Sequence, residues 1–184
     1  MNVRTLPLAG DVLHIVDDAV PTADVRRFEA FCRALPFNRV RYGYRATAEQ
    51  ELSFGHQWIH GVAPDERRFL PIDTVEGLVG QLLGEVKPGR VHLNCVQPGD
   101  PRYPHVDDTT GRVIVAVYFA NAEWRTEWAG ELTFYEDGEP VYAIRPKPGR
   151  ILVFDGNVLH RGGVPSADCP EVRYALACKF LRAA

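Results

Sequence analysis

The spacing of apolar residues separates an early part of the chain with two helices from a later part made of short strands. In residues 22–35 and again in residues 73–86, apolar side chains recur at the spacing of one helix face. Thr22 opens the first run and a Pro-Gly pair follows the second, and such residues commonly mark where helices begin and end. The pattern predicts two amphipathic helices, the first capped by Thr22, with a short strand at residues 13–16 before them.

From residue 90 onward, the chain consists of short apolar runs separated by Gly and Pro turns. Runs at intervals of about 8–12 residues are typical of a β-sandwich or barrel. Helices early and strands late predict an α+β fold, mainly β, in which residues 1–90 provide helical support for a jelly-roll or cupin-like core at residues 90–184. We interpret residues 1–184 as a single domain. The predicted strands of the core are residues 91–96, 112–120, 131–135, 141–144, 150–154 and 173–181.

The composition is that of a soluble globular protein, with 46% hydrophobic residues, 24% charged residues and a net charge of −3. A slightly acidic chain has no positive field that would attract nucleic acid, and no apolar run is long enough to predict a membrane span or a signal peptide. We therefore expect a cytoplasmic protein with neither nucleic-acid nor membrane partners. Its four cysteines form no C-x-x-C pair and are expected to be reduced thiols.

The strongest chemical signal is an H-x-D triplet, His105 and Asp107, followed along the chain by His160 and then by Arg173. Two histidines and one carboxylate are the ligands of the facial triad that binds Fe(II) and leaves its other positions open. Residues i and i+2 of an extended segment point to the same side, so His105 and Asp107 can face one cavity. The permanently charged fork of an arginine suits a carboxylate of a co-substrate.

Other interpretations of these residue types remain open. His56 and His60 have the spacing at which two imidazoles on a helix could share zinc, but the glycines beside them favour a strand, and no third ligand is evident. The three metal candidates could each be ordinary turn residues or strand caps. Arg173 could form a structural ion pair, and other nearby cations could replace it as the anchor for a carboxylate, namely Lys147, Arg150 and Arg161.

Several segments occur in an order that resembles the prolyl-hydroxylase-type 2-oxoglutarate/Fe(II)-dependent dioxygenases. The resemblance implies a double-stranded β-helix core and Fe(II), 2-oxoglutarate and O2 as cofactors, with ascorbate as a further candidate. It covers nearly the whole chain and is weakest between residues 37 and 90. The segments are HIVDDAVP (14–21), QPGDPRYPHVD (97–107), RVIVAVYFAN (112–121), AGELTFY (129–135), PKPGRILVFDGNVLHRGGVP (146–165) and RYALACKFL (173–181).

The resemblance also implies roles for individual residues. It assigns His105, Asp107 and His160 to iron and to catalysis. It assigns Arg173 to the C5 carboxylate of 2-oxoglutarate, with the Tyr118 hydroxyl as a second donor. The chain departs from the family pattern at two other positions, where Gln97 replaces a Tyr that often precedes Pro-Gly and Lys179 replaces a Trp common in the last strand.

The activity implied is hydroxylation of an unactivated C–H bond with release of succinate and CO2. Because of Lys179, we expect a small-molecule substrate such as an amino acid or a natural-product intermediate, with a protein or peptide prolyl residue as the alternative. Residues 41–60 mix glycines with aromatic side chains and are interpreted as a mobile lid. The substrate contacts expected here are Trp58 in the lid and, on the opposite rim, Asp108 and Arg161.

Two other function classes compete with an oxygenase. A non-catalytic β-barrel binding module would be expected to lose a metal ligand or the anchoring cation, and this sequence retains all of them. A cupin-like metalloenzyme that does not use 2-oxoglutarate would leave Arg173 and Tyr118 without a role. The retained carboxylate of Asp107 also argues against a halogenase of this superfamily, in which its loss opens a position for halide.

Overall fold

The computed structural model describes residues 1–47, 51 and 53–183. Two α-helices and two short 3-10 helices accompany antiparallel strands in this part of the chain, which confirms the predicted α+β, mainly β fold. None of its helices has the length and apolar character needed to cross a membrane. The helices are α1 (Thr22–Ala34), η1 (Arg67–Phe69), α2 (Ile72–Leu83) and η2 (Thr126–Trp128).

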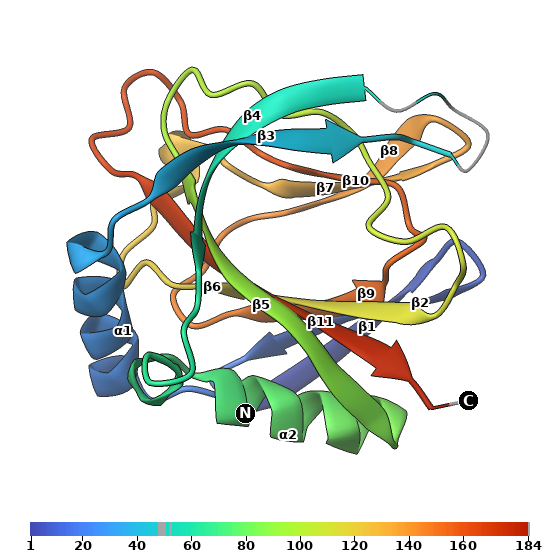
Figure 1. Cartoon of the computed structure of the whole chain (residues 1–184), viewed down its shortest axis with the longest axis horizontal. Helices are drawn as coiled ribbons and strands as arrows, with labels where there is room; N and C mark the ends of the chain where they lie inside the picture. The colour runs from blue at the N-terminus through green and yellow to red at the C-terminus, as the bar shows by residue number, and fades with distance from the viewer. Residues whose placement is uncertain (48–50, 52, 184) are drawn as a thin grey trace.

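The strands form two sheets that face each other (Figure 1). The larger sheet has the order β1-β2-β9-β6-β11-β5-β4-β3, and the smaller has the order β10-β7-β8. The strands are β1 (Asn2–Leu8), β2 (Asp11–Asp17), β3 (Asn38–Tyr44), β4 (Ser53–Gly61), β5 (Val86–Val96), β6 (Val113–Phe119), β7 (Leu132–Glu136), β8 (Glu139–Ile144), β9 (Ile151–Asp155), β10 (His160–Gly162) and β11 (Arg173–Arg182).

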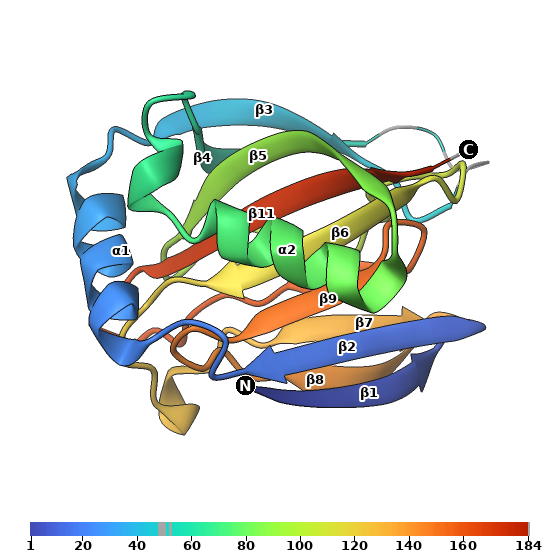
Figure 2. The same ribbon diagram turned by 90° about the horizontal axis from the view of Figure 1, so that it is seen from below.

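Each face of the larger sheet packs against a different layer. On the outer face, α2 lies across the strands and α1 stands at one end of them (Figure 2), and apolar residues of both helices join those of β5, β6 and β11 in a helix-side core. On the inner face, apolar residues of β2, β6 and β9 meet those of β7 and β8 in an inter-sheet core. Because side chains alternate along a strand, Ile114, Ala116 and Tyr118 of β6 face the helices, while Val117 and Phe119 face the smaller sheet.

The early part of the chain contains an additional strand, β1, and is more regular around residues 37–62 than its strand-like sequence pattern indicates. The strand predicted at residues 13–16 is part of β2, and β1 pairs with it along its whole length at one edge of the large sheet. At the other edge, β3 and β4 form an antiparallel hairpin that pairs with β5. The predicted helices are confirmed, except that Thr22 is the first residue of α1 after Pro21 and makes no side-chain cap.

Candidate metal and co-substrate site

Backbone hydrogen bonds hold the three predicted metal ligands in one place. His105 and His160 form an isolated β-bridge in which each backbone N–H donates to the other carbonyl, with N···O distances of 2.9 and 3.0 Å. The N–H of Asp107 donates to the carbonyl of Gly156 at 2.8 Å. His160 begins β10 of the small sheet, whereas His105 and Asp107 lie in the connection from β5 to β6. The bridge thus joins residues that are far apart in the sequence.

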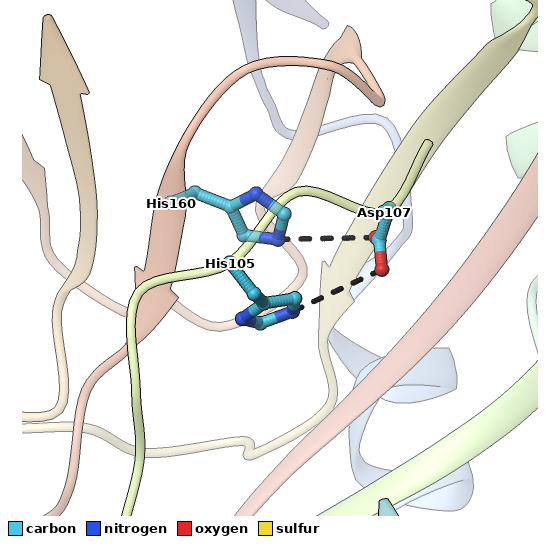
Figure 3. A group of neighbouring side chains, drawn as sticks. All are labelled: His105, Asp107 and His160. Atoms are coloured by element: carbon cyan, nitrogen blue, oxygen red, sulfur yellow. Dashed lines mark ion pairs between the residues drawn. The ribbon is translucent and has the colours of Figure 1, made fainter. Parts of the chain in front are cut away.

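The side chains of His105, Asp107 and His160 converge on one point (Figure 3). The Nε2 atom of each histidine lies 3.8 Å from an oxygen of Asp107, a different oxygen in each case. The two imidazole rings have centroids 4.6 Å apart, and all three potential ligand atoms lie within 4.8 Å of one another. No other group of three such residues is found among residues 1–47, 51 and 53–183.

Backbone carbonyls select the tautomer of both histidines. The Nδ1 atom of His105 lies 3.0 Å from the carbonyl oxygen of Tyr103, and that of His160 lies 2.9 Å from the carbonyl oxygen of Val158. A carbonyl only accepts hydrogen bonds, so the hydrogen of each neutral ring is on Nδ1. The Nε2 lone pairs are therefore free and directed toward Asp107, as they are in histidines that bind a metal.

The charges at this point suit a cation. Burial, and then the neighbouring His105, lower the pKa of His160 to about 4, so its ring is neutral at pH 7. Burial alone would raise the pKa of Asp107, but His160, Lys179 and His105 outweigh it and hold this pKa at about 2. The group therefore presents two imidazole nitrogens and one carboxylate.

Lys179 is hydrogen-bonded to Asp107, the carboxylate of the candidate metal site. Its Nζ atom donates a hydrogen bond of 3.0 Å to Oδ1 of Asp107 and is only partly exposed. The ammonium group balances the buried carboxylate charge and orients it. The position where an aromatic side chain is common therefore places a cation beside the candidate metal site.

The residues present fit an Fe(II) ion. Two neutral imidazoles and one carboxylate are the donor set of the facial triad. Ligand atoms about 2.1 Å from a metal at right angles would be about 3 Å apart, so these side chains need to approach each other by about 1–2 Å. Because Nδ1 of each histidine is already bonded to a carbonyl, the approach requires small rotations and no change of tautomer.

Arg173 lies in the same cavity as the three candidate ligands. It is the first residue of β11 and is only 4% exposed, and its guanidinium carbon stacks 5.8 Å from the centre of the Phe119 ring. Its Nε donates to the carbonyl of Gly163 at 3.2 Å. A Cβ atom on Gly162 would lie 3.1 Å from Nη2 of Arg173, so that glycine makes room for the guanidinium.

The charge of Arg173 has no carboxylate partner within ion-pair distance in the described part of the chain. Burial, and then the neighbouring Arg102, lower its pKa to about 9, and the more distant carboxylate of Glu131 offsets only part of this fall. A buried cation without an anion is costly, because it gives up water without gaining an ion pair. An external carboxylate would remove that cost. Arg173 is therefore well placed to bind an acidic co-substrate.

The predicted role of Tyr118 is wrong. Tyr118 lies on the helix side of β6, where its ring packs edge-on against Phe28 at 6.3 Å and is completely buried. Arg173 faces the opposite side of the sheet, together with Phe119. Since neighbouring side chains of a strand point in opposite directions, the Tyr118 hydroxyl cannot reach a molecule bound to Arg173. The residue beside the guanidinium is a phenylalanine, which offers no hydroxyl.

We therefore expect Tyr118→Phe to leave the KM for 2-oxoglutarate unchanged. The hydroxyl of Tyr118 is buried without a hydrogen-bond partner, so its removal should raise the free energy of unfolding by up to about 1 kcal/mol. Urea denaturation and initial-rate measurements on the same preparation test both expectations. A several-fold rise in this KM, without loss of stability, would contradict the placement of Tyr118 on the helix side.

None of the three expected substrate contacts lines the cavity. Trp58 of β4 pairs with Cys95 and packs on the helix-side core. Arg161 is exposed because its neighbour His160 points inward. Asp108 accepts backbone hydrogen bonds that hold its own turn, from Thr110, Arg112 and Val113. It borders an outer groove of about 370 Å³ but not the cavity itself.

The predicted lid at residues 41–60 is regular structure in its described portion. Residues 48–50 and 52 lie outside the described residues, and most of the remainder belongs to β3 and β4. Tyr42 of β3 contacts the His105 ring edge-on at 5.7 Å, and Tyr44 stacks on Tyr103 at 4.6 Å. His56 and His60 lie on the strand β4 and not on a helix, and Nε2 of His60 is hydrogen-bonded to Glu66. Both facts disfavour a zinc site shared by these two histidines.

Sequence reasoning missed most of the polar wall of the cavity. Arg90, His92 and Asn94 alternate along β5 and share its inner face, and Arg102 comes from the loop that follows. The period of two in R-V-H-L-N was a usable signal, because polar residues alternate there with Val91 and Leu93. The cavity that these residues line has a volume of about 90 Å³.

Among known protein families, the 2OG-Fe(II) oxygenase superfamily has a model that matches residues 91–180 of the chain. This range contains the three candidate ligands and Arg173. No curated protein sequence matches the chain significantly.

Solved structures share the fold over nearly the whole chain. A prolyl hydroxylase from Trichoplax adhaerens, bound to a peptide of hypoxia inducible factor, has a TM-score of 0.67 and 18% identity, covering 92% of this chain and 83% of its own. A Pseudomonas putida prolyl-4-hydroxylase has a TM-score of 0.66 and 21% identity, covering 94% and 93%. The α-ketoglutarate-dependent epimerase SnoN of nogalamycin biosynthesis has a TM-score of 0.67 and 18% identity, covering 93% and 78%. At these identities the likeness establishes the fold.

Proposed function

Because residues 91–180 match the 2OG-Fe(II) oxygenase superfamily, we propose that the chain is an oxygenase of this superfamily that hydroxylates an unactivated C–H bond of a small molecule. An amino acid or a natural-product intermediate is the expected class of substrate. His105, Asp107 and His160 hold Fe(II) in this proposal, and Arg173 holds the C5 carboxylate of 2-oxoglutarate. When bound, the iron and the co-substrate supply the oxidising chemistry, which consumes O2 and yields succinate, CO2 and the hydroxylated product.

One observation carries the proposal. The buried guanidinium of Arg173, which has no carboxylate within ion-pair distance among the described residues, lines the same cavity as three side chains whose metal-binding atoms converge. A metal site alone would suit many functions, and a buried arginine alone could be structural. Their combination suits a co-substrate with a group for the metal at one end and a carboxylate at the other.

The protein's own residues would orient the metal ligands and keep water away from the reacting groups. The Tyr103 and Val158 carbonyls keep both histidine rings in the tautomer that presents Nε2, and Lys179 holds one oxygen of Asp107. The inner faces of β6 and β11 give the cavity an apolar floor, which disfavours water near the reacting groups. This floor consists of Val115, Val117, Ala175 and Ala177.

A prolyl residue of a protein or peptide is the second candidate substrate. It is favoured by the fold shared with the two prolyl hydroxylases, one of which is described in complex with a peptide. The ammonium of Lys179 beside Asp107 favours a polar substrate over the apolar ring of a proline. The shared fold with a natural-product epimerase accords with a small molecule.

Succinate formation tests the proposal. The purified protein is incubated with Fe(II), ascorbate and 2-oxoglutarate, alone and with a panel of amino acids, natural-product acids and prolyl peptides, and succinate is measured by mass spectrometry. We expect slow succinate formation that requires Fe(II) and is stimulated by a small molecule. Stimulation only by prolyl peptides would select the second candidate. Lack of Fe(II)-dependent succinate in every mixture would contradict an oxygenase function.

A further inference from the structure

The cavity contains more positive than negative side chains. Asp107 is the one carboxylate among the described residues that line it, and it is bonded to Lys179. In the proposed function, the far carboxylate of 2-oxoglutarate pairs with Arg173, and its other end is at the metal. Arg90 and Arg102 then remain, and neither has a carboxylate within ion-pair distance among the residues described.

Arg102 is the more constrained of the two. It is only partly exposed, its Nε is buried without a hydrogen-bond partner, and its Nη2 makes one long hydrogen bond of 3.4 Å to the carbonyl of Cys95. A guanidinium group has five N–H donors in a planar fork, so most of those of Arg102 are available to a ligand. Such a fork matches the two oxygens of a carboxylate.

Other polar atoms without partners lie on the adjoining wall. His92 Nδ1 and Asn94 Oδ1 are buried without hydrogen bonds, and both residues line the cavity from the inner face of β5, as Arg90 does. Tyr42 of β3 lines the same cavity as Arg90 and Arg102. Tyr42 itself contacts the ring of His105. The wall thus extends from the candidate metal site to two uncompensated arginines.

We propose that the donors of this wall, Arg102 and Arg90 with Tyr42 and His92, bind a carboxylate of the substrate, so that the enzyme acts on a small carboxylic acid; Asn94 Oδ1, which only accepts, would face an N–H or O–H of the same molecule. The inference rests on the proposed function, because it treats the metal and 2-oxoglutarate as occupying the rest of the cavity. Arg90 and Arg102 line the same cavity as the candidate metal site, so a carboxylate bound to them would hold a small acid beside the metal. Arg102 is the specificity-determining residue, and Arg90 and Tyr42 complete the subsite.

Matched pairs of probes test the proposal without knowledge of the natural substrate. The protein is loaded with Mn(II) and saturating 2-oxoglutarate, which prevents turnover and occupies Arg173, and calorimetry measures binding of N-acetyl amino acids and of their primary amides. Each pair differs only in its carboxylate. We expect acids to bind about tenfold or more tightly than their amides, because an ion pair with a buried arginine replaces a neutral contact.

Variants identify the residue responsible. In Arg102→Gln the preference for acids should largely disappear, and in Arg102→Lys, which retains the charge but not the fork, it should be intermediate. Arg161→Gln is the matched control, because Arg161 is exposed and does not line the cavity, and it should keep the full preference. Thermal denaturation confirms that each variant is folded.

Several results would overturn the carboxylate subsite. They are equal binding of acids and amides, an unchanged preference in folded Arg102→Gln, and failure of every acid to bind at millimolar concentration. Tighter binding of peptides with Asp or Glu side chains than of the small acids would overturn the small-molecule assignment. Binding of 2-oxoglutarate to the Mn(II)-loaded protein is measured first. Its failure would count against the proposed function instead, so the two failures are distinguishable.

Discussion

Replacing Asp107 with alanine is expected to abolish succinate formation and to weaken Fe(II) binding by more than 100-fold. Loss of a residue that merely supports a metal ligand costs about 10–100-fold in metal affinity, and loss of a ligand costs more. Asp107 supplies the one carboxylate that faces both Nε2 atoms of the candidate site. Its removal also leaves the Lys179 ammonium close to the metal position, where it would repel a cation. Calorimetric metal titration and succinate assays measure the two effects.

Asp108→Asn provides the matched control. Asp108 is the next residue in the chain, but its carboxylate accepts hydrogen bonds from its own turn, and an asparagine can still accept some of them. We expect this variant to lose some thermal stability and to keep its metal affinity. If Asp107→Ala bound Fe(II) as tightly as the unmodified protein, or if Asp108→Asn lost the metal instead, the ligand assignment would be wrong.

The second large effect is expected at the anchor for the co-substrate. Arg173→Ala should raise the KM for 2-oxoglutarate by tenfold to more than a hundredfold, since a lost charge-assisted contact costs about 1.5–3 kcal/mol. The effect should be large because the guanidinium is buried and is held in place by the Gly163 carbonyl and the Phe119 ring. Initial rates of Fe(II)-dependent succinate formation across 2-oxoglutarate concentrations measure it.

One further variant separates charge from shape at this position, and a second variant at another arginine is the control. Arg173→Lys keeps a cation but not the planar fork, so its KM should lie between those of the unmodified protein and Arg173→Ala. Arg161→Ala removes an exposed arginine that was a rival anchor on sequence grounds and should change nothing. An Arg173→Ala variant with a normal KM would contradict the assignment, and loss of 2-oxoglutarate binding in Arg161→Ala would transfer the role to that residue.

The sequence predicted most of the fold because the later strands have buried faces with a clear apolar pattern. The strand at residues 150–154 corresponds to β9, and that at 131–135 corresponds to β7, within a residue or two. The H-x-D triplet is also informative, because its two ends point to the same side of an extended segment. Edge strands carry a weaker pattern. β1 is largely exposed, and it forms through pairing with β2, which local sequence does not encode.

The prediction for Tyr118 differs from the structure by one position along β6, because Val117 and Phe119 face the smaller sheet and Tyr118 faces the helices. A strand buried on both faces, such as β6, shows no alternation between apolar and polar residues, so V-I-V-A-V-Y-F does not reveal which side chains face the cavity. Structure settles this, because Val117 lines the cavity and Tyr118 therefore cannot. The contact between Lys179 and Asp107 was likewise hidden, since it depends on how β11 passes the loop after β5.

The most direct test of the proposed site is a crystal structure of the protein with Mn(II) and 2-oxoglutarate, in which anomalous scattering locates the metal. We expect one peak at about 2.0–2.3 Å from Nε2 of His105, Nε2 of His160 and a carboxylate oxygen of Asp107. We also expect the far carboxylate of 2-oxoglutarate to contact the guanidinium of Arg173. A metal bound elsewhere, or 2-oxoglutarate density away from Arg173, would contradict the site assignment.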